Sequence, residues 1–155
     1  MASTSRVPAP DGARREEIDV KYMIMLSGSQ RDYDRLAGRS ADGSAWTAEE
    51  GAAFHEFMVK WNNELVESGE FVEARGLTAP VHARRIRLSG GAAVVTDGPY
   101  AETQEVLAGY TVVECESFDR ATEIAAKLAL APGGHQPEAY VDVRPIAEGA
   151  GDLDG

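Results

Sequence analysis

The residues best suited to chemistry lie in the segment Asp97-Gly98-Pro99-Tyr100. Proline fixes its own φ and keeps the residue before it out of the α region, so the chain must turn sharply here. In one interpretation, Asp97 is a general base, or orients a histidine, at the mouth of a pocket. In a second, its carboxylate only caps the turn by accepting hydrogen bonds from the amides that follow. A third interpretation is ligand binding without catalysis.

The three histidines are the other candidate acid/base groups. His55 lies at the edge of the apolar stripe of a predicted helix, where a histidine is commonly a packed or surface residue. His82 precedes a basic segment, and His135 follows two glycines. None has the spacing to a further ligand that is typical of metal motifs. We therefore expect no metal ion and no other cofactor, although a site built from distant residues stays open.

The one basic cluster is Arg84-Arg85-Ile86-Arg87. In an extended strand Arg85 and Arg87 share one face, and Ile86 and Leu88 share the other. These arginines are either an exposed face that discourages pairing with other strands, or a lip that binds a carboxylate or phosphate. The single cysteine, Cys115, ends another predicted strand and fits a small buried residue better than a nucleophile.

Composition excludes several classes of protein. The chain has 155 residues, of which 43% are hydrophobic, and a formal net charge of -11. Such a charge argues against direct binding to nucleic acid, which needs clustered Lys and Arg. No apolar run approaches the roughly 20 residues that span a bilayer, and the N-terminus lacks a secretory apolar region. A single cysteine fits a reducing compartment, so we expect a cytoplasmic protein without membrane contact.

The elements that must position these groups follow from the apolar pattern. Thr47-Ala-Glu-Glu50 is a capping box that begins a helix ending at Ser68-Gly69, and Ser117 caps a second helix. Residues 29–46 are polar and predict a long loop. The predicted strands cover residues 20–27, 70–77, 81–88, 92–96, 109–115 and 139–145.

This order predicts an α+β fold of the ferredoxin-like split βαβ kind, an antiparallel sheet with two helices on one face. The domain would span residues 20–146, between a mobile N-terminal arm (1–19) and a flexible acidic tail (147–155). The other sheet face is left bare although the first strand is apolar almost throughout. A second copy of the chain is the simplest cover, so we expect a homodimer.

Residues 97–109, Asp-Gly-Pro-Tyr-Ala-Glu-Thr-Gln-Glu-Val-Leu-Ala-Gly, closely resemble the signature of the DGPF subgroup of YCII-related proteins. Lys21-Tyr-Met23, Trp61-Asn-Asn-Glu-Leu65, Tyr110-Thr-Val-Val-Glu114 and Val143-Arg-Pro-Ile146 extend the resemblance over residues 20–146. Tyr100 and Gln104 depart from the usual Phe and Lys; the first adds a hydroxyl and the second removes a charge.

The resemblance implies a dimeric α+β barrel and an association with extracytoplasmic-function sigma factors. For more distant members it implies a His–Asp catalytic pair, which here would be His55 and Asp97. The first functional hypothesis is therefore a cofactor-independent acid/base enzyme, for elimination, isomerisation or proton transfer on a small anionic or aromatic molecule. The residues expected to bind that substrate are Tyr100, Trp61, Asn62, Arg85, Arg87 and Glu102. The alternative is a non-catalytic accessory protein that acts with a sigma factor.

Overall fold

The structure is a computed structural model that describes residues 20–133 and 139–149. The predicted arm (1–19), His135 and residues 150–155 of the predicted tail lie outside the described residues. The elements are β1 (Val20–Gly28), α2 (Gln30–Leu36), α3 (Ala48–Ser68), β2 (Phe71–Gly76), the 3₁₀ turn η1 (Pro80–His82), β3 (Arg84–Ser89), β4 (Ala92–Asp97), β5 (Val106–Cys115), α4 (Phe118–Ala129) and β6 (Val141–Pro145).

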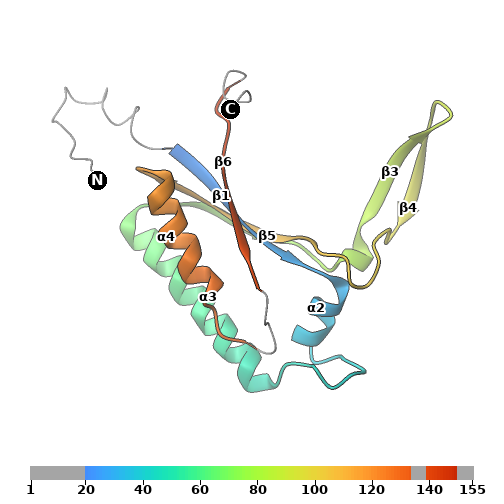
Figure 1. Ribbon diagram of the computed structural model, residues 1–155, viewed down its shortest axis with the longest axis horizontal. Coiled ribbons are helices and arrows are strands. Elements are labelled where there is room, and N and C mark those ends of the chain that lie inside the picture. The colour runs from blue at the N-terminus through green and yellow to red at the C-terminus, as the bar shows by residue number, and fades with distance from the viewer. Residues whose placement is uncertain (1–19, 134–138, 150–155) are drawn as a thin grey trace.

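Four strands form one antiparallel sheet in the order β2-β5-β1-β6. The two central strands, β1 and β5, are joined to the outer strands through the crossovers that contain α3 and α4. Both long helices cover the same side of this sheet (Figure 1). This arrangement confirms the predicted ferredoxin-like α+β fold.

Helix α3 begins and ends where its sequence predicts. The Thr47 hydroxyl accepts a hydrogen bond from the Glu50 amide at 3.1 Å, and the Glu50 carboxylate accepts one from the Thr47 amide at 2.8 Å. The helix ends at Gly69, which has a φ of 80°, a conformation that glycine adopts without steric penalty. The caps fix both ends of a 21-residue helix, and hence the side chains it turns toward the sheet.

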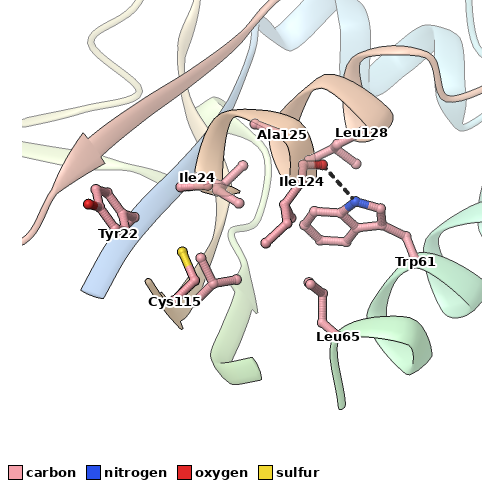
Figure 2. Packing of buried hydrophobic residues seen from close by; sticks show 10 residues of the cluster. Tyr22, Ile24, Trp61, Leu65, Cys115, Ile124, Ala125 and Leu128 are labelled. Carbon is pink, nitrogen blue, oxygen red and sulfur yellow. Dashed lines mark hydrogen bonds between the residues drawn. The ribbon is translucent and has the colours of Figure 1, made fainter. Parts of the chain in front are cut away.

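The hydrophobic core lies between the sheet and α3 and α4, as Figure 2 shows. Trp61 and Leu65 come from α3, and Ile124 and Leu128 come from α4. They pack against strand residues that include Ile24, which is 1% exposed. Cys115 is buried in the same cluster, as the sequence predicts.

The prediction of a loop over residues 29–46 was partly wrong, because α2 forms within it. Ser29 caps this helix: its hydroxyl accepts from the Asp32 amide at 3.1 Å, and Asp32 accepts from the Ser29 amide at 2.9 Å. The Tyr33 hydroxyl donates to the carbonyl of Leu77 at 2.7 Å, which fixes α2 against the end of β2. None of the residues of α2 is fully buried, so its apolar pattern is weak.

The remaining two strands, β3 and β4, form a separate hairpin that projects from the body on the side away from α3 and α4 (Figure 1). The hairpin prediction is confirmed, and the register pairs Arg85 with Thr96 and Ile86 with Val95. Because successive side chains along a strand point to opposite faces, Arg85 and Arg87 lie on one face while Ile86 and Leu88 lie on the other. Every residue of both strands is exposed.

Candidate functional site

A cavity of about 640 Å³ lies between the helix-covered face of the sheet, α2 and α3. This volume is within the range of pockets that bind small organic molecules. The apolar part of the lining includes Ile24, Leu26, Leu36, Trp46, Phe54, Met58, Leu77, Leu128 and Val141. Trp46 and Phe54 meet edge to face, with ring centroids 5.6 Å apart. The site can therefore accept the apolar body of a ligand and an aromatic ring.

Asn62 is the sequence-predicted binding residue that lines this cavity. Its side-chain Nδ2 donates to the carbonyl of Met58, one turn earlier in α3, at 2.9 Å. Its Oδ1 is screened from solvent and has no hydrogen-bond partner among the described residues. A buried acceptor without a donor raises the free energy of the folded protein by about 1–3 kcal/mol. Asn62 is thus a polar group in an apolar site with unused bonding capacity.

The charged side chains of the lining already have partners within the chain. Arg35 donates from Nε to the Ser44 hydroxyl at 2.7 Å and lies 3.7 Å from an Asp32 carboxylate oxygen. The Glu105 carboxylate accepts from the Tyr140 hydroxyl at 2.5 Å. Arg75 donates from Nη1 to the backbone carbonyl of Ala74 at 2.9 Å. The residues of the lining therefore include two acidic and two basic ones, and the strand register directs the Arg75 side chain to the opposite face of the sheet.

Two tyrosines of the lining are held in their neutral form. Burial raises the pKa of the Tyr33 hydroxyl above its ordinary value of 10.0. The hydrogen bond to Glu105 raises the pKa of Tyr140 in the same direction, since the phenol donates to a carboxylate that the phenolate would repel. Both groups stay protonated at neutral pH and add no charge to the site.

Asp97 lies at the end of β4 and does not line the cavity. Its Oδ1 accepts a hydrogen bond from Arg84 Nε at 3.2 Å, across the hairpin, and its side chain is 81% exposed. The contact shown for the carboxylate is thus a cross-strand ion pair, whereas the interpretation of Asp97 as a turn cap expects bonds from the amides that follow. Gly98 makes the turn: its φ is 51°, and a Cβ there would lie 3.3 Å from the carbonyl oxygen of Val81.

Four more predicted residues lie on or next to the hairpin. The Arg85 guanidinium stacks over the Tyr100 ring, with Cζ 5.0 Å from the ring centroid, a cation–π geometry. Glu102 accepts from the Arg31 guanidinium at 3.0 Å, and its carbonyl accepts from the Arg31 amide at 3.1 Å. Arg87 is exposed further along β3. These contacts fix the base of the hairpin and hold the segment after it against α2.

The other two predicted residues lie in α3. Trp61 belongs to the core rather than to the cavity lining, and its indole Nε1 donates to the carbonyl of Ile124 at 3.1 Å (Figure 2). His55 is exposed and is not among the lining residues. Helix α3 and the hairpin lie on opposite sides of the molecule (Figure 1). Neither residue of the predicted pair, His55 and Asp97, lines the cavity.

Sequence reasoning missed the contribution of α2 and the segment after it, Tyr33, Arg35, Leu36 and Trp46. The signal was the Ser29-x-x-Asp32 pattern, an N-terminal cap with aspartate in the place where glutamate or glutamine is usual. Among residues 20–133 and 139–149, no group of three or more His, Cys, Asp and Glu side chains is arranged to hold a metal ion. In the same residues, no helix has the length and apolar character to cross a membrane.

Comparison with known proteins identifies a family model and a relative that match this chain. The family model described as the YCII-related domain matches residues 20–142, which includes β1, β2 and β5 of the main sheet and the beginning of β6. An uncharacterised protein of Rhizobium meliloti (strain 1021) is 33% identical over 104 residues, which are 67% of this chain and 82% of that relative.

Proposed function

The chain belongs to the YCII-related family, and we propose that it is a small-molecule-binding protein whose binding site is the cavity between the sheet, α2 and α3. The observation that carries the proposal is the cavity itself. Its volume of about 640 Å³ and its apolar lining, with few polar groups, are the usual properties of a ligand pocket. A protein that needed only a closed core would gain stability by filling this space.

A fluorescent probe and a blocking substitution test this proposal. The neutral probe N-phenyl-1-naphthylamine is expected to bind with increased emission. Ala74→Phe, which adds a ring from β2 into the cavity, should weaken that binding at least about tenfold, because the same space cannot hold both. Ala52→Phe is the matched control, since Ala52 is exposed on α3 and lies outside the lining. Equal affinity of both variants would place the probe elsewhere and refute the proposal.

We further propose that the protein acts as a homodimer through the sheet face opposite the helices. The register places Met23, Met25, Tyr110 and Val112 at the centre of this face, because they are opposed across β1 and β5. Around them lie three acidic and three basic side chains: Glu73, Glu114, Asp142, Lys21, Arg75 and Arg144. The chain as a whole has a net charge of -11, so two copies repel each other. This repulsion is smallest where a face without net charge meets its copy.

The projecting hairpin extends the proposed interface. Ile86 and Leu88 are 65% and 81% exposed, and Val95, opposite Ile86, is 59% exposed. A two-stranded hairpin by itself is marginally stable in water, so burial of this apolar face by a partner would stabilise it. Its arginines also give the hairpin positive charge that suits an acidic second copy.

Charged substitutions on the hairpin are expected to separate the two copies. Ile86→Glu with Leu88→Glu should convert a dimer into a monomer in sedimentation or light-scattering measurements, because the carboxylates would be desolvated in the interface. The matched control is Val59→Glu with Val66→Glu, two exposed valines on the outer surface of α3. A monomeric wild-type protein, or a dimer lost only in the α3 variant, would contradict the proposal.

The acid/base reaction and the association with a sigma factor stay predictions. The reaction would use His55 of one copy and Asp97 of the other, since His55 belongs to α3 and Asp97 to β4, and α3 and the hairpin lie on opposite sides of the molecule (Figure 1). Such a pair requires the hairpin of each copy to reach α3 of its partner. A crystal structure of the dimer in which the two side chains lie beyond a water-bridged contact would exclude it.

A further inference from the structure

We propose that the ligand of the cavity is a neutral, largely apolar or aromatic molecule with a hydroxyl or N–H group that donates a hydrogen bond to Asn62 Oδ1. This inference rests on the proposed function, since it names the ligand class of the same site. It departs from the anionic ligand that the arginine cluster favours, because that cluster lies on the hairpin and outside the lining.

The donor requirement follows from the hydrogen bonds of Asn62. The amide has already used Nδ2 on the Met58 carbonyl, while Oδ1 has no donor among the described residues. Oδ1 itself is screened from solvent, so a ligand reaches it when a flexible side chain of the lining such as Met58 moves aside, while Nδ2 keeps its hydrogen bond to the Met58 carbonyl. A ligand donor then satisfies an acceptor that the protein leaves unpaired, whereas a ligand acceptor at the same place would add a second unpaired group.

The other residues of the lining indicate that the ligand is uncharged. Most of the surrounding side chains are apolar, and a charged ligand would have to leave water without a compensating partner. Arg35, the half-buried cation of the lining, is already engaged by Ser44 and Asp32. An anionic ligand would have to compete with these partners, and a cationic ligand would compete with Arg35 for Asp32.

Three matched naphthalenes test the inference by displacement of N-phenyl-1-naphthylamine from the wild-type protein. 1-Naphthol has a donor, 1-methoxynaphthalene has the same rings without it, and 1-naphthoate is an anion at neutral pH. We expect naphthol to bind about 3–10-fold more tightly than the methyl ether, as one net hydrogen bond provides, and naphthoate to bind more weakly than either.

Substitutions assign the effect to Asn62. In Asn62→Leu, which keeps the approximate size without a polar group, the preference of about 3–10-fold for naphthol over the ether should disappear. Asn63→Leu, the exposed neighbour on the same helix, should retain it. If Asn62→Leu fails to fold, Asn62→Ala serves for the same comparison, with thermal melting as the check on folding.

The outcomes separate this inference from the proposed function. Failure of the fluorescent probe to bind in the cavity would refute both. Binding of the probe with equal displacement by naphthol and the ether in the wild-type protein would overturn the donor requirement alone. Tighter binding of naphthoate than of naphthol would overturn the neutral class, with the cavity still the binding site.

Discussion

Replacement of Trp61 by alanine is expected to lower the free energy of unfolding by about 3–5 kcal/mol, the usual loss for a large aromatic side chain removed from a packed core. Trp61 is 4% exposed and joins α3 to α4 through its hydrogen bond to the Ile124 carbonyl. The substitution removes both the ring and the indole donor. Urea denaturation followed by circular dichroism measures the loss.

Trp46→Ala is the matched control for this prediction. Trp46 is the other tryptophan of the chain; it is half-buried and lines the cavity rather than the core. We expect its loss of stability to be less than half that of Trp61→Ala, because fewer contacts are lost and solvent can fill the space. Similar losses in the two variants would contradict the assignment of Trp61 to the core.

Glu70→Gln is expected to lower stability by about 1–2 kcal/mol at pH 7, because it breaks a paired ionic contact that is only partly exposed. Arg120 Nε and Nη2 donate to the two Glu70 carboxylate oxygens, each at 2.8 Å, and the Ser68 hydroxyl donates to one of them at 2.7 Å. This contact joins the residue between α3 and β2 to the first turn of α4.

The effect should depend on pH in a defined direction. The hydrogen bonds from Arg120 lower the pKa of Glu70 below its ordinary value of 4.5. A lowered pKa in the folded state stabilises the protein above the unfolded value, and this contribution is lost as the pH falls through the folded value. The free energies of unfolding of wild type and Glu70→Gln, measured by urea denaturation, should therefore become more similar as the pH falls below about 4.5.

Glu102→Gln provides the control, since its pair with Arg31 has side chains that are 64% and 43% exposed. An exposed pair of this kind contributes about 0–1 kcal/mol, so its variant should differ little from wild type at either pH. If the difference in free energy of unfolding between wild type and Glu70→Gln stayed constant or increased in acid, the charge of the Glu70 carboxylate would not be what stabilises the contact.

The main elements could be predicted because their signals are local. The caps at Thr47 and Ser117 and the apolar spacing of Trp61 and Leu65 depend on residues within a few positions of each other, so they predict the two long helices. Helix α2 was missed because it has seven residues and none of them is fully buried. In so short and exposed a helix, apolar residues do not recur often enough to show helical spacing in the sequence.

The candidate site was harder to predict for a different reason. The turn at Asp97 attracted attention because its residue types are unusual, and the structure places it at the base of a hairpin, outside the cavity. The cavity is lined by mostly ordinary apolar side chains from several separate elements. Asn62 was predicted as a binding residue, but its unpaired oxygen depends on where Met58 and the sheet lie in space.

The strand order also determines when this protein can begin to fold during its synthesis. Within residues 20–133 and 139–149, β1 pairs only with β5 and β6, and β2 pairs only with β5, so no pair of these strands can form before residues 106–115 leave the ribosome. Until then the apolar residues of β1 and α3 have no sheet to cover, whereas the hairpin, whose strands are neighbours in sequence, can close at once. Such non-local pairing slows folding and exposes the nascent chain to aggregation, which makes the early chain a substrate for chaperones that hold unfolded segments.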